Sequence, residues 1–319
     1  MSSIDSRPVA VVTGASRGLG FLLAREFARR GYDLVIAARS QDGLVAARDD
    51  LARYAAEVRD VAADVGDPND AARLIVEAEQ RFGRLDVLVA NAGIIEVGPA
   101  STMTIEDYEQ AMHVMFWGTV RPVLAAMPLL RRSHGRVLAV TSVGGKLPPP
   151  HLLPYGAAKH AAVGFAEGLR IEAAADGVSV TVAVPGLMRT GSTRNALFSG
   201  DRSAEQRWVT AAASLPVLSM DAERAARRLV VATLRGRPEV TLTPLAKLGV
   251  RVHALAPSTT LRALTLVDRL LPSGTDATRS EPGHTIGPQP RWFERLVRND
   301  RTAARRWHEH DDPSPAGSS

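Results

Sequence analysis

Short apolar runs alternate with longer segments of helical length and composition along the first 245 residues. The apolar runs fall at residues 8–13, 32–38, 86–90, 136–141, 178–184 and 239–243. The helical segments fall between them, at residues 21–30, 68–82, 105–130 and 155–175. Such alternation is typical of an open parallel sheet covered by helices on both faces. We therefore predict a Rossmann-type, doubly wound α/β fold for residues 1–245.

The chain continues beyond that core as a predicted helical extension, residues 246–319. A Leu/Ala/Arg-rich stretch at 245–271 is helix-like, and residues 272–290 form a Pro/Gly-rich linker. Residues 291–310 are predicted to form a second short helix, and the last eight, 312–319, to be disordered.

The second helix of the extension carries an apolar stripe flanked by arginines. The stripe consists of Trp292, Leu296, Ala303 and Trp307. Such a stripe favours docking on the enzyme body or on a second subunit, and weak contact with a membrane surface is the alternative. The titratable residues at its end are predicted to be solvated; they are His308, Glu309, His310 and Asp311.

A glycine-rich turn separates the first apolar run from the first helical segment. It follows Thr13 and reads Gly14-Ala-Ser16-Arg17-Gly18-Leu19-Gly20. Glycines permit a tight turn and let a pyrophosphate approach backbone amides at the positive end of the following helix. The strand, turn and helix together predict a dinucleotide-binding site, although the G-x-x-x-G-x-G spacing differs from the general G-x-G-x-x-G fingerprint.

The end of the second strand predicts which dinucleotide binds. A carboxylate there would hold the ribose 2′-hydroxyl of NAD, but the chain has Ala38, followed by Arg39 and Ser40. Arg17 lies in the nearby turn, and guanidinium groups suit a 2′-phosphate. We therefore predict NADP(H) in preference to NAD(H).

A hydroxyl, a phenol and an amine occur at a spacing that suggests chemistry on a carbonyl. Ser142 ends the run at 136–141, and Tyr155 and Lys159 are four residues apart on one helix face. An adjacent ammonium would lower the pKa of the Tyr155 phenol, so that it exchanges a proton near neutral pH. Ser142 is expected to hydrogen-bond the same substrate oxygen.

Composition excludes several other classes of function. The formal charge is +5, but no run of five basic residues and no nucleic-acid motif occurs, so nucleic acid is not an expected partner. The absence of cysteine excludes disulfides and thiolate metal sites, and no metal site is predicted. With no signal peptide or spanning segment in the sequence, we expect a cytoplasmic protein.

These motifs, in this order, resemble the compact branch of the short-chain dehydrogenase/reductase family. The resemblance covers about residues 7–245, and it adds Asp64-Val65, Asn91-Ala92-Gly93 and Pro185-Gly186-Leu-Met188-Arg-Thr190 to the motifs above. It implies that Asp64 and Val65 flank the adenine and that Asn91, Ala92 and Gly93 line the cofactor. It further implies that Lys159 holds the nicotinamide ribose, that Met188 and Thr190 meet the carboxamide and phosphate side, and that the protein is a homodimer or homotetramer.

One position departs from the family pattern. The family usually has an asparagine in the long central helix, where it supports a water-linked proton path to the lysine; this chain has Met115. A thioether accepts hydrogen bonds only weakly and donates none. Proton relay through this position is therefore in doubt, and His113 is interpreted as structural.

The most variable segment of such enzymes, about residues 187–216 here, is predicted to be a substrate flap. Apolar residues in and near it suggest a hydrophobic carbonyl or alcohol substrate, unless they pack only on one another; they are Leu147, Pro148, Leu152, Leu153, Leu187, Ala196, Leu197 and Phe198. Two other functions stay open: a catalytically weakened NADPH sensor or scaffold, and a peripheral-membrane reductase of lipids or steroids.

Overall fold

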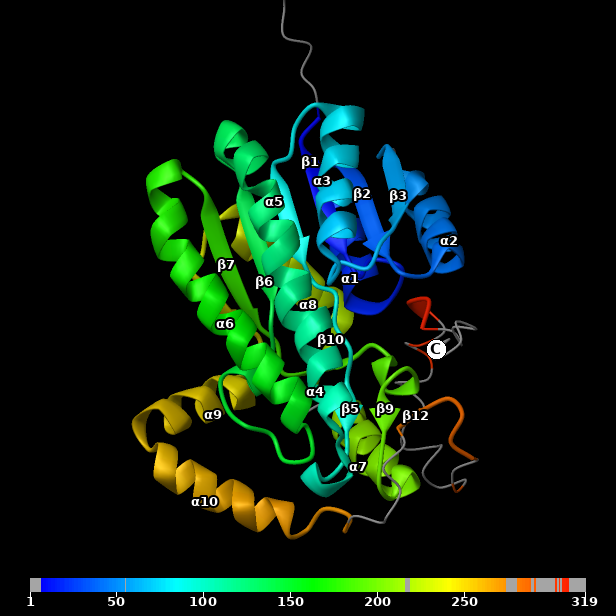
Figure 1. Ribbon diagram of the computed structural model, residues 1–319, viewed down its shortest axis with the longest axis vertical. Helices are drawn as coiled ribbons and strands as arrows, with labels where there is room; N and C mark the ends of the chain where they lie inside the picture. Colours follow the sequence, from blue (N-terminus) through cyan, green and yellow to red (C-terminus); the bar gives the residue numbers. More distant parts are fainter. Residues whose placement is uncertain are drawn as a thin grey trace, which may run out of the picture.

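A computed structural model describes residues 7–54, 56–215, 219–273, 280–287, 290, 302, 304 and 306–309. Its centre is one seven-stranded parallel sheet with strand order β11-β7-β6-β4-β1-β2-β3 (Figure 1). The strands are β1 (Val9–Thr13), β2 (Asp33–Ala38), β3 (Val58–Ala62), β4 (Val87–Ala90), β6 (Arg136–Val140), β7 (Ser179–Val184) and β11 (Glu239–Thr241). β1 lies between β2 and β4, so the strand order reverses there, and ligands of such sheets bind at this point.

Helices cover both faces of the sheet and enclose two apolar layers. One layer contains α1 (Gly18–Ala28), α2 (Gln41–Leu51) and α8 (Ala222–Leu234). The other contains α3 (Pro68–Phe82), α5 (Gly118–Ser133) and α6 (Leu153–Ala173). Successive residues of β1 point to opposite layers, Ala10 and Val12 to the first and Val11 to the second. The predicted doubly wound fold is confirmed.

The long central helix is interrupted. The sequence predicts one helix over residues 105–130, whereas the structure has α4 (Ile105–Ala111), a π-helix (Met112–Trp117) and then α5. Thr104 caps the N-terminus of α4 in a capping box. Its hydroxyl accepts from the backbone N–H of Asp107, and the Asp107 carboxylate accepts from the backbone N–H of Thr104. Short 3₁₀ turns occur at Ala52–Tyr54, Ala100–Thr102, Val143–Gly145, Ala174–Asp176 and Ser192–Arg194.

The predicted flap has secondary structure of its own. It contains β8 (Leu187–Arg189), β9 (Leu197–Phe198) and α7 (Arg202–Ser214). β8 pairs with β10 (Ser219–Asp221), and β9 lies between β5 (Glu96–Val97) and β12 (Glu281–Pro282). Because β12 belongs to the predicted linker at 272–290, that linker is not simply a spacer: it pairs with the flap.

The extension begins with two helices beside the sheet domain. The helix-like stretch at 245–271 forms α9 (Pro244–Leu255) and α10 (Pro257–Asp268), separated at Ala256 because a proline follows it (Figure 1). α10 buries none of its residues. Among the helices that the structure describes, none is both long enough and apolar enough to cross a bilayer. Most of the predicted helix at 291–310 and all of residues 312–319 lie outside the described residues.

Candidate active site

The turn after β1 is so tight that it requires glycine. A Cβ on Gly20 would clash with the Gly14 carbonyl oxygen, and one on Gly14 would lie 2.8 Å from Cα of Ala92. Gly14 and Gly18 also have φ angles of 64° and 56°, in the region that favours glycine. α1 begins at Gly18 without a side-chain cap. This cradle fits the pyrophosphate of a dinucleotide, which needs close backbone approach at a helix N-terminus.

The loops after β1 and β4 are tied together at the cradle. The side-chain amide of Asn91 donates to the carbonyls of Thr13 (3.0 Å) and Gly14 (3.2 Å). The Thr13 hydroxyl accepts from the backbone N–H groups of Asn91 (2.9 Å) and Ala92 (3.1 Å). Asn91 therefore supports the turn, and its predicted contact with the cofactor stays a prediction.

The residues predicted for the adenine and the 2′-phosphate flank this cradle. Ser40 caps α2, accepting from the Gly43 amide at 3.4 Å, and the side chain of Arg39 is exposed. Arg17 lies 3.6 Å from Glu309. Asp64 accepts from the Gly66 amide and lies 3.2 Å from His113 Nε2. His113 thus packs against the turn after β3, where Gly66 leaves no room for a side chain.

The segment after β7 lies beside the loop after β6. The Val143 amide donates to the Pro185 carbonyl at 2.8 Å. A Cβ on Gly186 would lie 2.8 Å from the Thr243 hydroxyl, and Thr190 is buried with its hydroxyl accepting from Ser192. Met188 is partly buried against the apolar layer of α1 and α8. Pro185, Gly186, Met188 and Thr190 thus follow the carboxyl end of β7, beside residues that follow β6 and β11.

Ser142, Tyr155 and Lys159 come together at the carboxyl end of β6. A Cβ on Gly144 would lie 3.1 Å from the Tyr155 ring and 3.5 Å from Ser142 Oγ. Lys159 Nζ lies 5.9 Å from the centre of the Tyr155 ring and donates to the Val140 carbonyl at 3.0 Å. The spacing in the sequence therefore does place the three groups side by side.

The protonation of these groups differs from the expectation. Burial raises the pKa of Tyr155, and its hydrogen bond with Ser142 opposes that rise. Burial lowers the pKa of Lys159 to about 8. The expected lowering of the Tyr155 pKa by the ammonium is wrong for this structure, because desolvation by burial dominates.

Met115 and Lys159 both lie close to Gly93. Met115 is fully buried in a small apolar cluster with Ala111, Val114 and Ala158. A Cβ on Gly93 would lie 3.7 Å from Met115 Cγ and 3.6 Å from Lys159 Nζ. Its position within the π-helix matches the common placement of π-helical turns at functional sites.

The C-terminal residues lie across the cradle. The expectation that His308 and Glu309 are solvated is wrong: Glu309 is 5% exposed, and His308 is half-buried against Asp50. Trp307 is 5% exposed, which agrees with docking of the stripe rather than membrane contact. Trp292, Leu296, Ala303, His310 and Asp311 lie outside the described residues.

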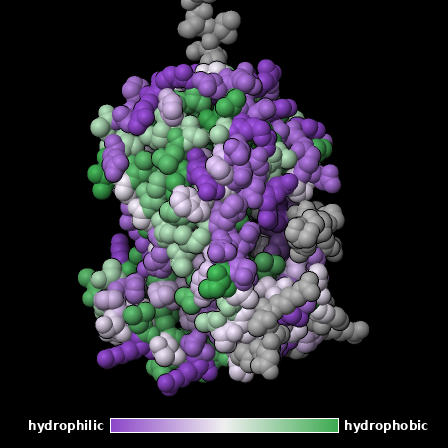
Figure 2. Space-filling view, in the orientation of Figure 1, coloured by the Kyte–Doolittle hydropathy of each residue, from purple (hydrophilic) through white to green (hydrophobic). Residues whose placement is uncertain are grey.

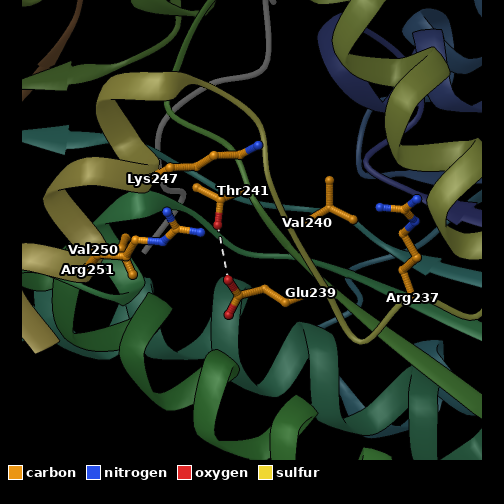
Figure 3. Close-up of a pocket in the computed structure, with 7 residues that line it drawn as sticks. All are labelled: Arg237, Glu239, Val240, Thr241, Lys247, Val250 and Arg251. Atoms are coloured by element: carbon orange, nitrogen blue, oxygen red, sulfur yellow. Dashed lines mark hydrogen bonds between the residues drawn. The ribbon is translucent and has the colours of Figure 1, made fainter.

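Some predicted pocket residues instead form the core of the flap. Ala196 and Phe198 are 1% and 0% exposed and pack with Val97 and Val209. Leu153 and Leu187 are 48% and 39% exposed. A separate cavity of about 260 Å³ lies between β11 and α9 (Figure 3). Its lining includes Lys247 and none of the predicted site residues.

Two buried acidic residues near the flap were not predicted from the sequence. Glu96 is 1% exposed, and among the described residues no hydrogen-bond partner reaches its Oε2. Glu205 is fully buried and lies 2.7 Å from His151 Nδ1, while Trp208 donates to its other oxygen at 2.6 Å. His151 has a φ of 59°, a strained value for a non-glycine residue. No local sequence pattern marks these residues. Glu205 and His151, for example, are 54 residues apart in the sequence.

Comparisons with known proteins agree with this geometry. The profile of the family described as "short chain dehydrogenase" matches residues 8–198. An "11-beta-hydroxysteroid dehydrogenase A" of Sesamum indicum is 38% identical over 239 residues, 73% of this chain and 67% of that protein. A "Dehydrogenase/reductase SDR family protein 7-like" of Anopheles gambiae is 33% identical over 78% of this chain and 80% of its own length. The match to the Arabidopsis thaliana "11-beta-hydroxysteroid dehydrogenase 1A" spans only 56% of that protein.

Two solved structures are similar in fold. A short-chain dehydrogenase from Streptomyces avermitilis has a TM-score of 0.70 and 28% identity, covering 84% of this chain and 99% of its own. An alcohol dehydrogenase from Thermococcus sibiricus, solved with 5-hydroxy-NADP, has a TM-score of 0.62 and 25% identity. The match covers 74% of this chain and 96% of that structure's chain. The matched profile spans more than half of the chain and includes all three catalytic candidates. The chain therefore belongs to the short-chain dehydrogenase/reductase family of oxidoreductases.

Proposed function

We propose that the protein is an NADP(H)-dependent oxidoreductase acting on the carbonyl or secondary alcohol of a hydrophobic, steroid-like substrate. The observation that carries the proposal is the grouping of Ser142, Tyr155 and Lys159 beside a cradle built for a dinucleotide. When bound, the nicotinamide supplies a hydride to a carbonyl carbon or accepts one from an alcohol carbon.

The protein groups handle the proton and the substrate oxygen. Ser142 orients that oxygen, and Tyr155 exchanges a proton with it. Because burial raises its pKa, Tyr155 is protonated at neutral pH, which suits proton donation and hence carbonyl reduction. Lys159, with a pKa of about 8, is mostly charged at neutral pH. Its proposed role is to hold the ribose hydroxyls, as the family resemblance implies.

The preference for NADP(H) is supported by the charges at the end of β2. Ala38 stands where a carboxylate would select NAD, and the exposed Arg39 is available for a 2′-phosphate. The Thermococcus sibiricus relative was solved with an NADP analogue. Asp64, Val65 and Asn91–Gly93 are proposed to line the nucleotide as the family resemblance implies.

A hydrophobic substrate is supported by the surroundings and by the relatives. Leu153, two residues before Tyr155, and Leu187, at the start of the flap, keep exposed apolar surface. The sesame and Arabidopsis relatives carry names of hydroxysteroid dehydrogenases. A steroid ketone is therefore the first substrate class to test.

The test measures NADPH consumption with a panel of apolar ketones, steroid ketones included, for the wild type and Tyr155→Phe. We expect Tyr155→Phe to lower kcat by roughly 10²- to 10⁴-fold while NADPH still binds. Tyr54→Phe, a change of the same kind on the far side of α2, is the matched control and keeps full activity. Full activity of Tyr155→Phe would refute the assigned role, and tight NADPH binding without turnover would favour the sensor.

Association with other surfaces is also part of the proposal. Hydrophobic surface gathers over α5 and α6 (Figure 2), and this fits the expected homodimer or homotetramer. Leu124 of α5 and Ile171 of α6 are among the exposed apolar side chains. We also propose weak contact with anionic membranes, through α9 and α10 rather than through the stripe of Trp307.

The cytoplasmic location stays a prediction.

A further inference from the structure

The C-terminal residues 302, 304 and 306–309, called here the C-terminal segment, cross the beginning of α1. The backbone N–H of Gly18, the first residue of α1, donates to the Trp307 carbonyl at 2.8 Å. The Trp307 ring is buried in the apolar layer beneath α1, with the Arg25 guanidinium 4.9 Å from its centre. The segment thus occupies one of the amide donors that the cradle offers to an anion.

The segment also brings an anion of its own to this position. A Cβ on Gly18 would lie 2.5 Å from Glu309 Oε1, so the carboxylate lies directly in front of the helix end. Glu309 Oε2 accepts a hydrogen bond from the Asn195 amide at 2.6 Å and lies 3.6 Å from Arg17 Nε. A negative charge is stabilised at a helix N-terminus, which is also where the pyrophosphate of a dinucleotide lies in this fold.

Further contacts hold the segment on both sides of the cradle. His308 lies 2.9 Å from the Asp50 carboxylate of α2, and its ring meets the Phe21 ring edge-on at 4.7 Å. On the flap side, Ala304 packs so closely on Gly191 that any side chain at 191 would clash with it. The segment therefore joins α1, α2 and the flap next to Thr190.

We propose that the C-terminal segment is an intrachain competitor of the nucleotide, with the Glu309 carboxylate in the place of the cofactor pyrophosphate. The proposal rests on the proposed function, since it concerns the same cofactor site. The Trp307 carbonyl takes the Gly18 amide that the pyrophosphate would use, and the Glu309 carboxylate repels the pyrophosphate, so the segment leaves the cradle when the nucleotide binds. The apparent Kd then equals the intrinsic Kd divided by the fraction of molecules whose segment is released.

The first test compares NADPH affinity in full-length variants. Glu309→Gln keeps the size of the side chain but removes its charge, and Trp307→Ala removes the ring that anchors the segment. We expect NADPH to bind roughly five- to ten-fold more tightly to Glu309→Gln, since the charge at the helix end and beside Arg17 is lost. Trp307→Ala is expected to tighten binding at least as much. Glu172→Gln, the same change at an exposed position of α6, leaves the Kd unchanged.

The second test follows the segment itself by hydrogen exchange with mass spectrometry, without turnover. With saturating NADPH, peptides from 14–20 should become protected, while peptides from 302–309 should exchange faster. Protection of both regions, or Kd values within twofold of the wild type for both variants, would overturn the competition and leave the proposed function standing. If neither NADPH nor NADH protected residues 14–20 in any variant, the proposed function and the competition would both be refuted.

Discussion

At the scale of single residues, Glu96 is the most unusual group outside the catalytic centre. It is 1% exposed, and its Oε2 has no hydrogen-bond partner in the part of the chain that the structure describes. Burial, and to a lesser degree the nearby charge of Asp107, raises the pKa of Glu96 to about 8. The folded protein therefore keeps this carboxyl protonated at pH values where the unfolded chain ionises it.

Replacing Glu96 by glutamine should change how stability depends on pH. Between pH 4.5 and 8 the folded state binds more protons at this site, so wild-type stability falls as the pH rises through that window. Glu96→Gln removes that slope, and its advantage should grow to on the order of 5 kcal/mol near pH 9. Urea unfolding at pH 5, 7 and 9 measures the difference, with the exposed Glu109→Gln as control. An equal difference at all three pH values would contradict the raised pKa.

The residues that sequence reasoning found are those whose partners are close along the chain. Tyr155 and Lys159 share a helix face because they are four residues apart, and Gly14 and Gly20 belong to one turn. Glu309 and Gly18 are almost the whole chain apart, and their contact depends on where the extension docks. The protonation of Tyr155 could not be predicted from the sequence either, because burial decides whether its pKa is raised or lowered.

At the scale of elements, the central helix contains a feature that hydrophobic periodicity does not predict. Its length and apolar spacing predict one helix, but hydrophobic periodicity does not reveal the π-helix at Met112–Trp117. There, the Thr119 hydroxyl donates to the Met115 carbonyl at 2.8 Å. By contrast, Pro257 marks the break between α9 and α10 in the sequence itself. Sequence analysis missed strand β3 because it is half-exposed. It contains Arg59 and Asp60, so the sequence has no apolar run there.

The π-helix makes the role of Met115 testable. Met115→Leu conserves the volume of a fully buried side chain, so we expect a loss of at most about 1.5 kcal/mol in unfolding free energy and an unchanged kcat. Met115→Asn restores the residue usual in the family but buries an amide in an apolar cluster, at a cost of about 1–3 kcal/mol. Denaturant unfolding and kcat are measured for both variants. A tenfold lower kcat in a stable Met115→Leu would contradict the expectation that this side chain only packs.

At the scale of the whole molecule, exposed apolar side chains concentrate on one appendage. Exposed leucines and valines run along α9, α10 and the turn after α10, Leu255 at 87% and Leu270 at 85% among them. Exposed basic residues lie between them, including Lys247 and Arg251, which Figure 3 shows beside the cavity. Apolar and cationic groups together on a surface helix are typical of contact with anionic lipid.

The proposed membrane contact predicts a specific loss in the variant Leu255→Glu/Leu270→Glu. Each change replaces an apolar group worth about 2 kcal/mol when buried by a carboxylate that anionic lipid repels. We therefore expect co-sedimentation with phosphatidylserine-containing vesicles to weaken at least roughly tenfold, without any change in NADPH binding. Val76→Glu, at an exposed apolar position of α3, should sediment like the wild type. Equal sedimentation of all three proteins would exclude α9 and α10 as the membrane contact, because a surface that binds lipid through these leucines cannot tolerate two buried charges.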